Sequence, residues 1–272
     1  MIPRDFITEW RAHAAWTQDA QVEQDLVISR ALVEMFRVGD IAEHLAFRGG
    51  TALYKLHLLP AARYSEDIDL VQVQAEPIGE MLDLVRSVLD PWLGTPQRKF
   101  NEGRVNLVYR FDSEDAPPLL MRLKIEINSR EHFTELGLTH IPVRVDSRWF
   151  SGAADVTTFE IDELLGTKLR ALYQRKKGRD LYDLWLALRS LTLDDEQVVE
   201  CFERYLEEGH TRISRAEFEA NLTAKLQMPA FLDDIAPLLP TGAQYDVAGA
   251  AVLVRDRLIA KLRGEPWKGA VK

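Results

Sequence analysis

Residues 47–70, FRGGTALYKLHLLPAARYSEDIDL, constrain this chain more than any other stretch. A short apolar run ends at Gly49-Gly50, where two residues without Cβ let the backbone approach a ligand closely. Apolar residues at 52, 53, 56 and 59 have helical spacing, so we expect a helix over residues 52–59 with Thr51 placed to cap it. The free N–H groups and the positive dipole end of that helix would form a cradle for phosphate.

Two acidic residues follow on a predicted strand. After Pro60 the chain alternates polar and apolar residues over 65–71, which is the period of a strand, so Asp67 and Asp69 project from the same face. Two carboxylates this close raise each other's pKa unless a cation lies between them. A hard dication is their natural occupant. A Gly-Gly alone is usually a turn, and an Asp-x-Asp alone is usually a solvated face. Their order and closeness favour a site for a triphosphate and its magnesium.

Composition sets the broad class. The 272 residues allow one large or two small domains, and 46% hydrophobic with 28% charged residues is ordinary for a soluble globular protein. The single Cys201 excludes an internal disulfide framework and a multi-cysteine zinc site. We expect a cytoplasmic protein without a membrane partner, because the chain opens with no signal peptide and carries no apolar run of spanning length. The net charge of −9 argues against a protein that coats nucleic acid non-specifically.

The apolar patterns predict an α+β fold in two parts. We expect a mixed sheet with flanking helices over residues 1–158, and a C-terminal helical bundle over 159–272. The first part has strand patterns at 105–111 and 119–128, shorter strand pieces at 142–145 and 156–159, and helical patterns ending near Phe36 and over 78–93. The predicted helices of the second part cover residues 162–174, 180–188, 195–207, 214–226 and 244–263.

A third carboxylate is expected on the strand at 119–128. Its alternation places Lys124, Glu126 and Asn128 on one face. Taken alone, Glu126 would be a solvent-facing strand residue. Beside a strand that carries Asp67 and Asp69, it becomes the candidate third acidic ligand.

Positive charge is concentrated in one stretch of the second part. Six Lys or Arg and no acidic residue lie between Lys168 and Arg179, which is compatible with a patch facing an anionic substrate. A solvated helix end would explain residues 175–177 equally well. It explains Lys168 less well, because Lys168 lies four residues from both Leu164 and Leu172, on the apolar face. A lysine directed inward needs an anion.

These motifs resemble a known family. Gly49-Gly50-Thr51 followed by Asp67-Ile68-Asp69 resembles the signature of the polymerase-beta-type nucleotidyltransferase superfamily. The run RYSEDID at 63–69 resembles, more narrowly, the AbiEii/AbiGii toxins of type IV abortive-infection systems. Lys168 and the run RKKGRD at 175–180 resemble the basic motif of those toxins, which ends in a functional aspartate. The matching motifs span about residues 48–183; the spacer between Gly50 and Asp67 is longer than usual for the wider superfamily, and Thr51 stands where Ser is frequent.

The resemblance implies a function. It implies transfer of a nucleoside monophosphate from an NTP to an RNA acceptor, which we expect to be tRNA. The protein would act as the toxin of a toxin–antitoxin or phage-defence system, and a cognate antitoxin would relieve its toxicity. It also implies a two-ion Mg²⁺ site. The expected catalytic residues are Asp67, Asp69, Lys168, Asp180 and Ser65; the expected nucleotide contacts are Arg48, Gly49, Gly50, Thr51, Arg63 and Lys168; and the expected metal ligands are Asp67, Asp69 and Glu126.

Two alternatives stay open. A small-molecule nucleotidyltransferase of the antibiotic-modifying kind shares the Gly turn and the Asp pair, although the region from Lys168 to Asp180 favours the toxin family. A non-catalytic nucleotide- or partner-binding protein with the same fold is disfavoured only by the intact Asp67 and Asp69. For Arg48 and Arg63, simple pairing with nearby acids is the alternative to phosphate contact.

Overall fold

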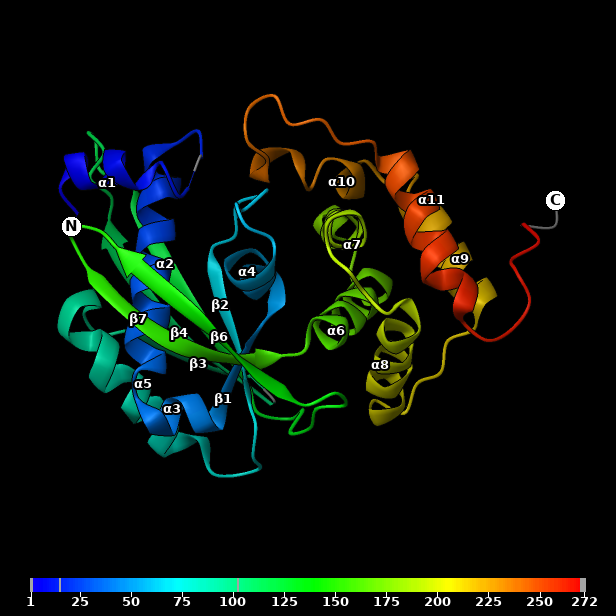
Figure 1. Cartoon of the computed structure of the whole chain (residues 1–272), viewed down its shortest axis with the longest axis horizontal. Coiled ribbons are helices and arrows are strands. Elements are labelled where there is room, and N and C mark those ends of the chain that lie inside the picture. The colour runs from blue at the N-terminus through cyan, green and yellow to red at the C-terminus, as the bar shows by residue number, and fades with distance from the viewer. Residues whose placement is uncertain (1, 15, 102, 270–272) are drawn as a thin grey trace. The chain divides into compact units, whose positions relative to one another are not determined.

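A computed structural model describes residues 2–14, 16–101 and 103–269 of the chain. The chain forms two compact units, Met1–Phe159 and Glu160–Lys272. The first unit combines a mixed β-sheet with helices, and the described part of the second is helical (Figure 1). The predicted α+β class is therefore confirmed.

The sheet of the first unit has seven strands within the described residues, in the order β3-β4-β5-β2-β1-β7-β6. Two of its pairings are parallel, β2 with β5 and β1 with β7, and the other four are antiparallel. Strand β2 lies between β1 and β5. The Gly turn after β1 and the predicted acidic residues of β2 and β5 are therefore brought together. The strands are β1 (Leu45–Arg48), β2 (Asp67–Gln72), β3 (Gln97–Asn101), β4 (Arg104–Asp112), β5 (Leu120–Asn128), β6 (Leu138–Asp146) and β7 (Ser151–Phe159).

Alternation explains why the acidic residues face away from the core. Ile68 and Leu70 of β2 are buried, as are Leu123, Ile125 and Ile127 of β5, and they form part of the main apolar cluster. Successive strand residues point to opposite faces, so the acidic side chains between them lie on the other face of the sheet.

Helix α2 holds the starts of these two strands. It is buried along most of its length, and its Gln24 side chain donates hydrogen bonds to the carbonyls of Glu66 (3.2 Å) and Arg122 (3.0 Å). These bonds fix the beginnings of β2 and β5 against one helix. The helices of this unit before and beside the sheet are α1 (Arg4–Trp10), α2 (Asp19–Phe36), α3 (Gly39–His44) and α5 (Ile78–Leu93).

The segment after β1 differs from the helix expected over residues 52–59. A four-residue α-helix, α4 (Gly49–Ala52), is followed by a π-helix, η1 (Leu53–His57), in which the N–H of Leu58 bonds the carbonyl of Leu53 at 2.9 Å. Within it, Lys55 reaches α2, where its ammonium pairs with Asp25 (2.7 Å) and Ser29 (2.8 Å). Thr51 lies inside α4 and does not cap a helix, because its hydroxyl bonds Ser65 and the carbonyl of Asp67.

Strands β3, β6 and β7 correct the strand predictions. Strand β3 was not predicted, because all five of its residues are exposed and so give no apolar alternation. Strands β6 and β7 form a hairpin of nine residues each, longer than the pieces expected at 142–145 and 156–159. The N-terminal helix α1 ends at Trp10.

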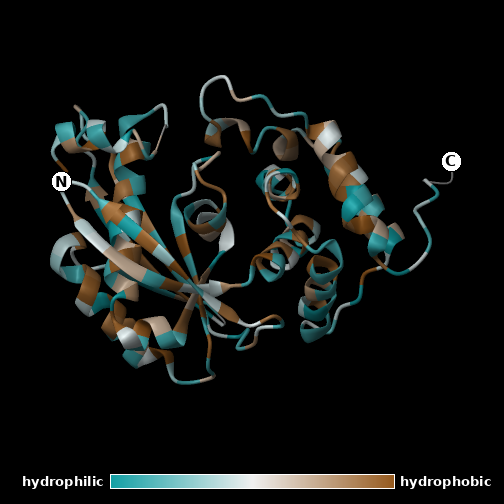
Figure 2. Ribbon diagram, viewed as in Figure 1, coloured by the Kyte–Doolittle hydropathy of each residue, from teal (hydrophilic) through white to brown (hydrophobic). Residues whose placement is uncertain are grey.

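The described part of the second unit consists of helices in which hydrophilic and hydrophobic residues alternate along the chain (Figure 2). Side-chain caps start three of them: Asp194 before α8, Ser214 with Glu217 as a capping box before α9, and Asp246 before α11. The long helix expected over 244–263 is α11 followed by a short 3₁₀ turn, η3. The helical segments are α6 (Ile161–Gln174), α7 (Gly178–Ser190), α8 (Asp195–Glu208), α9 (Arg215–Lys225), α10 (Pro229–Leu232), η2 (Ala236–Leu238), α11 (Val247–Arg257) and η3 (Ile259–Lys261).

Among the described residues, no helix is long and apolar enough to cross a membrane.

Candidate active site

Three carboxylates predicted to act together lie on adjacent strands. In the parallel register of β2 and β5, Asp67 stands opposite Lys124 and Asp69 stands opposite Glu126. The Lys124 ammonium lies 2.9 Å from Asp67 Oδ2 and 3.5 Å from Glu126 Oε2. On the far side of Glu126, Arg104 Nη1 approaches Oε1 at 3.2 Å. Strand pairing thus brings Asp67, Asp69 and Glu126 to one face, with a lysine among them.

The charges of this face perturb each other. Burial raises the pKa of Asp69, and the neighbouring carboxylates of Asp67 and Glu126 raise it further, although Lys124 and Arg48 oppose the shift. Burial alone would lower the pKa of Lys124. The hydrogen bond and charge of Asp67, with the charges of Glu126 and Asp69, outweigh burial and raise the Lys124 pKa above its ordinary value. Burial and the neighbouring carboxylates therefore both disfavour the charged form of Asp69.

The Gly turn presses against this acidic face. Gly49 has a φ of +85°, a conformation that L side chains rarely adopt, and a Cβ added to it would collide with the carboxylate of Asp69. A Cβ on Gly50 would come within 2.5 Å of the Arg63 guanidinium. Glycine is therefore required at position 49 by its positive φ and its approach to Asp69, while Gly50 lies close to the end of a buried arginine side chain.

Two hydroxyls tie the turn to β2. Thr51 Oγ1 donates to the backbone carbonyl of Asp67, and Ser65 Oγ lies 2.7 Å from Thr51 Oγ1. With the Thr51 proton directed to that carbonyl, the Ser65 hydroxyl donates to Thr51. Thr51 and Ser65 therefore hold the turn in register with the first acidic residue.

The two arginines expected near phosphate have protein partners. Arg48 Nη1 bonds Glu131 Oε2 at 2.6 Å, and Asn128 Nδ2 bonds the same oxygen at 3.2 Å. Arg63 is only 3% exposed, donates to the carbonyl of Tyr64 at 2.9 Å and stacks over the Tyr54 ring with its Cζ 4.8 Å from the centroid. Arg48 thus pairs with an acidic residue, whereas the contacts of Arg63 are to a backbone carbonyl and an aromatic ring.

The acidic face suits a hard divalent cation in charge and donor chemistry. The second oxygen of Asp67, Oδ1, is buried without a hydrogen-bond partner among the described residues, and carboxylate oxygens are the ligands that Mg²⁺ prefers. Nevertheless, the described residues contain no group of three or more His, Cys, Asp or Glu side chains gathered as a formed metal site. The residues fit such an ion, but Lys124 lies where two of the carboxylates would meet it.

The second unit carries the Lys168 motif as a buried charge cluster. Lys168 is 8% exposed, and its ammonium lies 3.4 Å from Asp180 Oδ1 and 3.0 Å from Asp183 Oδ2, both fully buried. Arg175 adds a two-point pairing to Asp180, at 2.5 and 3.1 Å. Asp180 was predicted from the sequence, whereas Asp183 was not. Its position three residues further along the same helix face was the available signal.

Most of the basic stretch is paired. Lys177 and Arg179 both approach Asp234, at 3.3 and 3.8 Å. Arg175 is held by Asp180. Nearby, the buried Lys225 donates to the carbonyls of Leu172 and Tyr173 at the end of α6, and burial lowers its pKa to about 8. The stretch is therefore less available as a basic surface than its composition indicates.

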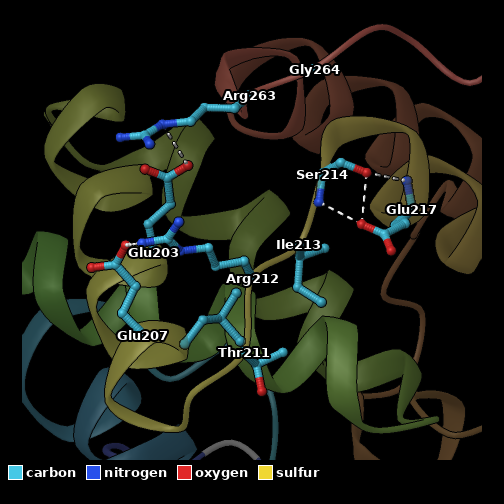
Figure 3. Close-up of a pocket in the computed structure, with 10 residues that line it drawn as sticks. Glu203, Glu207, Thr211, Arg212, Ile213, Ser214, Glu217, Arg263 and Gly264 are labelled. Atoms are coloured by element: carbon cyan, nitrogen blue, oxygen red, sulfur yellow. Dashed lines mark hydrogen bonds and ion pairs between the residues drawn. The ribbon is translucent and has the colours of Figure 1, made fainter.

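A separate pocket of about 400 Å³ opens in the second unit (Figure 3). Its charged residues are largely paired with one another: Arg212 with Glu207 at 3.5 Å, Arg263 with Glu203 at 3.9 Å, and Ser214 with Glu217 in the capping box. It contains none of the residues predicted to act on a nucleotide, so it does not define the candidate site.

Comparison with solved structures agrees with the fold. MenT4, a nucleotidyltransferase toxin from Mycobacterium tuberculosis H37Rv, superposes with a TM-score of 0.68 at 18% identity, covering 97% of this chain and 91% of MenT4. An antigenic nucleotidyltransferase-like protein from Paracoccidioides brasiliensis gives a TM-score of 0.41 at 16% identity, covering 79% of this chain and 98% of that protein. No curated protein matches the chain.

The mixed sheet and the helices around it thus share the fold of MenT4. A family model described as "Nucleotidyl transferase AbiEii toxin, Type IV TA system" matches residues 30–251. The chain belongs to this AbiEii family of nucleotidyltransferase toxins.

Proposed function

We propose that this protein transfers a nucleoside monophosphate from an NTP to an RNA acceptor in a Mg²⁺-dependent reaction. The observation that carries the proposal is the packing of the Gly49-Gly50 turn against Asp69, with Asp67 two residues away and Glu126 opposite Asp69 on the adjacent strand. Such a site can hold phosphates beside a cluster of carboxylates. Membership in the AbiEii family supports the reaction type.

The chemistry is attack by an acceptor hydroxyl on the α-phosphorus of the NTP, with pyrophosphate as the leaving group. The backbone of the Gly49-Gly50 turn would bind the β- and γ-phosphates, and Thr51 with Ser65 keeps that turn in place beside Asp69. For Lys168, the resemblance of its motif supports a role in neutralising the triphosphate. Asp180 would either orient Lys168 or make a base-like contact to the acceptor.

Asp67, Asp69 and Glu126 would hold the two magnesium ions. When bound, these ions would polarise the α-phosphate and stabilise the negative charge that develops during transfer. The buried, unbonded Asp67 Oδ1 and the raised pKa of Asp69 both favour a positively charged ligand at this face.

The proposed acceptor is tRNA. Modification of tRNA in the cytoplasm would be toxic to the cell, and a cognate antitoxin would relieve this toxicity. The proposed biological role is phage defence. The family resemblance supports these proposals; electrostatics supports only a polyanion. The test is incubation with each α-labelled NTP, Mg²⁺ and total cellular RNA, with Asp67→Asn as the inactive control. Label on an RNA band of tRNA length supports the proposal, whereas label on other RNA or on protein contradicts the tRNA acceptor.

A small-molecule acceptor is the second candidate, and one observation favours it. Arg175, Lys177 and Arg179 are already paired with Asp180 or Asp234, so fewer cations are available to follow a polynucleotide backbone. Label that appears in a small-molecule fraction, and never on RNA or protein, would select this candidate.

A further inference from the structure

Lys124 has no role in the reaction so far, although it lies among the three acidic residues. It stands directly opposite Asp67 in the β2–β5 register and two residues before Glu126 on the same face. Its ammonium contacts one oxygen from each, Asp67 Oδ2 at 2.9 Å and Glu126 Oε2 at 3.5 Å. The side chains of all three residues are between one fifth and one third exposed, so solvent weakens these interactions only in part.

Carboxylate oxygens of Asp67 and Glu126 would also be the ligands of a divalent cation held by these residues. A lysine ammonium and a hard cation both seek carboxylate oxygens, and two positive charges cannot share them without strong repulsion. Arg104 offers a contrast, because it contacts only the outer oxygen of Glu126 and its own side chain is 58% exposed. Lys124, by contrast, places its ammonium between the carboxylates of Asp67 and Glu126.

We propose that Lys124 is an internal counter-ion that occupies a metal position between Asp67 and Glu126 and must be displaced before the metal binds. This inference rests on the proposed function, since it presumes that these carboxylates are metal ligands. It explains why residues of suitable chemistry are not gathered as a formed metal site within the described part of the chain.

Displacement of Lys124 would also couple metal binding to nucleotide binding. A displaced ammonium needs another anion, and the phosphates of an incoming NTP supply one beside the same face. Metal alone must break the Lys124 contacts without compensation, so it binds weakly. Metal that arrives with a triphosphate exchanges one set of ion pairs for another, so it binds more tightly.

The test measures Mn²⁺ binding to the full chain by electron paramagnetic resonance at fixed ionic strength, without nucleotide. Removing the competing charge in Lys124→Met should tighten Mn²⁺ binding by at least about tenfold, given the strength of charge interactions at this separation. The matched control Arg104→Met removes the exposed cation that contacts Glu126 Oε1, and it should change the Mn²⁺ affinity far less. Asp69→Asn should abolish binding in both the native and the Lys124→Met backgrounds.

A second readout is thermal stability. Without metal, Lys124→Met should melt below the native protein, because Asp67 and Glu126 lose their shared counter-charge. Saturating Mn²⁺ should raise its melting temperature more than that of the native protein. Lys124→Gln, which keeps a polar side chain without charge, should repeat both results and serves if the methionine variant folds poorly.

The outcomes separate the two proposals. Equal Mn²⁺ affinity in the native protein, Lys124→Met and Lys124→Gln, with binding still lost in Asp69→Asn, would overturn the role of Lys124 and leave the metal site standing. Absence of Mn²⁺ binding in every variant, even with a non-hydrolysable NTP analogue present, would overturn the metal site itself.

Discussion

Gly49 and Asp69 are in such close contact that the glycine cannot carry a side chain. An added Cβ at Gly49 would come within 3.1 Å of the Asp69 Cβ and Cγ, and closer still to its carboxylate oxygen. The turn that would receive phosphate and the strand that would hold the metal are thus one structural unit. Changes on one side of this contact should be felt on the other.

Gly49→Ala should therefore impair transfer and destabilise the fold. The positive φ and the collision with Asp69 together should lower the free energy of unfolding by about 1–3 kcal/mol. The displaced carboxylate should also lower kcat. Gly79→Ala is the matched control, because Gly79 lies in α5 with nothing near its Cβ position. Chemical denaturation and kinetics on both variants check this. Equal behaviour of the two would show that the contact has no functional weight.

The raised pKa of Asp69 predicts a pH-dependent stability difference. A carboxyl group whose pKa is higher in the folded state than in the unfolded state destabilises the fold progressively as pH rises above the unfolded value, here 3.8. Without metal, Asp69→Asn should thus melt at an equal or higher temperature than the native protein at pH 7, and this advantage should disappear near pH 3.5. An advantage that grows on acidification would contradict the sign of the shift.

Lys168 should matter to both stability and activity, whereas Lys176 should matter to neither. Lys168→Ala leaves the buried Asp180 and Asp183 without their shared lysine, which should cost about 3–5 kcal/mol. Asp180→Ala should likewise impair transfer. The exposed Lys176 should change stability by less than about 0.5 kcal/mol when replaced by Ala. Transfer kinetics at a temperature where all variants are folded separate the effect on activity from the effect on stability. Equal activity in Lys168→Ala, Asp180→Ala, Lys176→Ala and Lys177→Ala would show that the stretch is only a diffuse basic surface.

An RNA acceptor should make the reaction salt-sensitive. About five phosphate contacts to a single-stranded end predict a log–log slope of roughly −3 to −4 for affinity against salt concentration. Filter binding or the KM for RNA across a salt series measures the slope. A flat response would favour the small-molecule acceptor, and so would agree with the pairing of Arg175, Lys177 and Arg179 by acidic residues.

Local patterns predicted the elements that carry the site, but not its contacts. The helix over 78–93 and the faces of β2 and β5 follow from apolar periodicity, which the sequence displays directly. Within the π-helix after Ala52, Lys55 contacts Asp25, which lies 30 residues earlier in the chain, and no local pattern reveals that contact. Lys124 was placed on the correct face with Glu126. Its position opposite Asp67 depends on strand register, and register is set by the whole sheet.

The measurement that tests the central claim most directly is transfer of α-label from NTP by the native protein, Asp67→Asn and Asp69→Asn, with melting temperatures recorded for each. Removing one ligand from the acidic face should abolish label transfer to the acceptor and the matching release of pyrophosphate, while each variant stays folded. Full activity in a folded Asp69→Asn variant would contradict the assignment of Asp67, Asp69 and Glu126 as the metal-binding face of a nucleotidyltransferase.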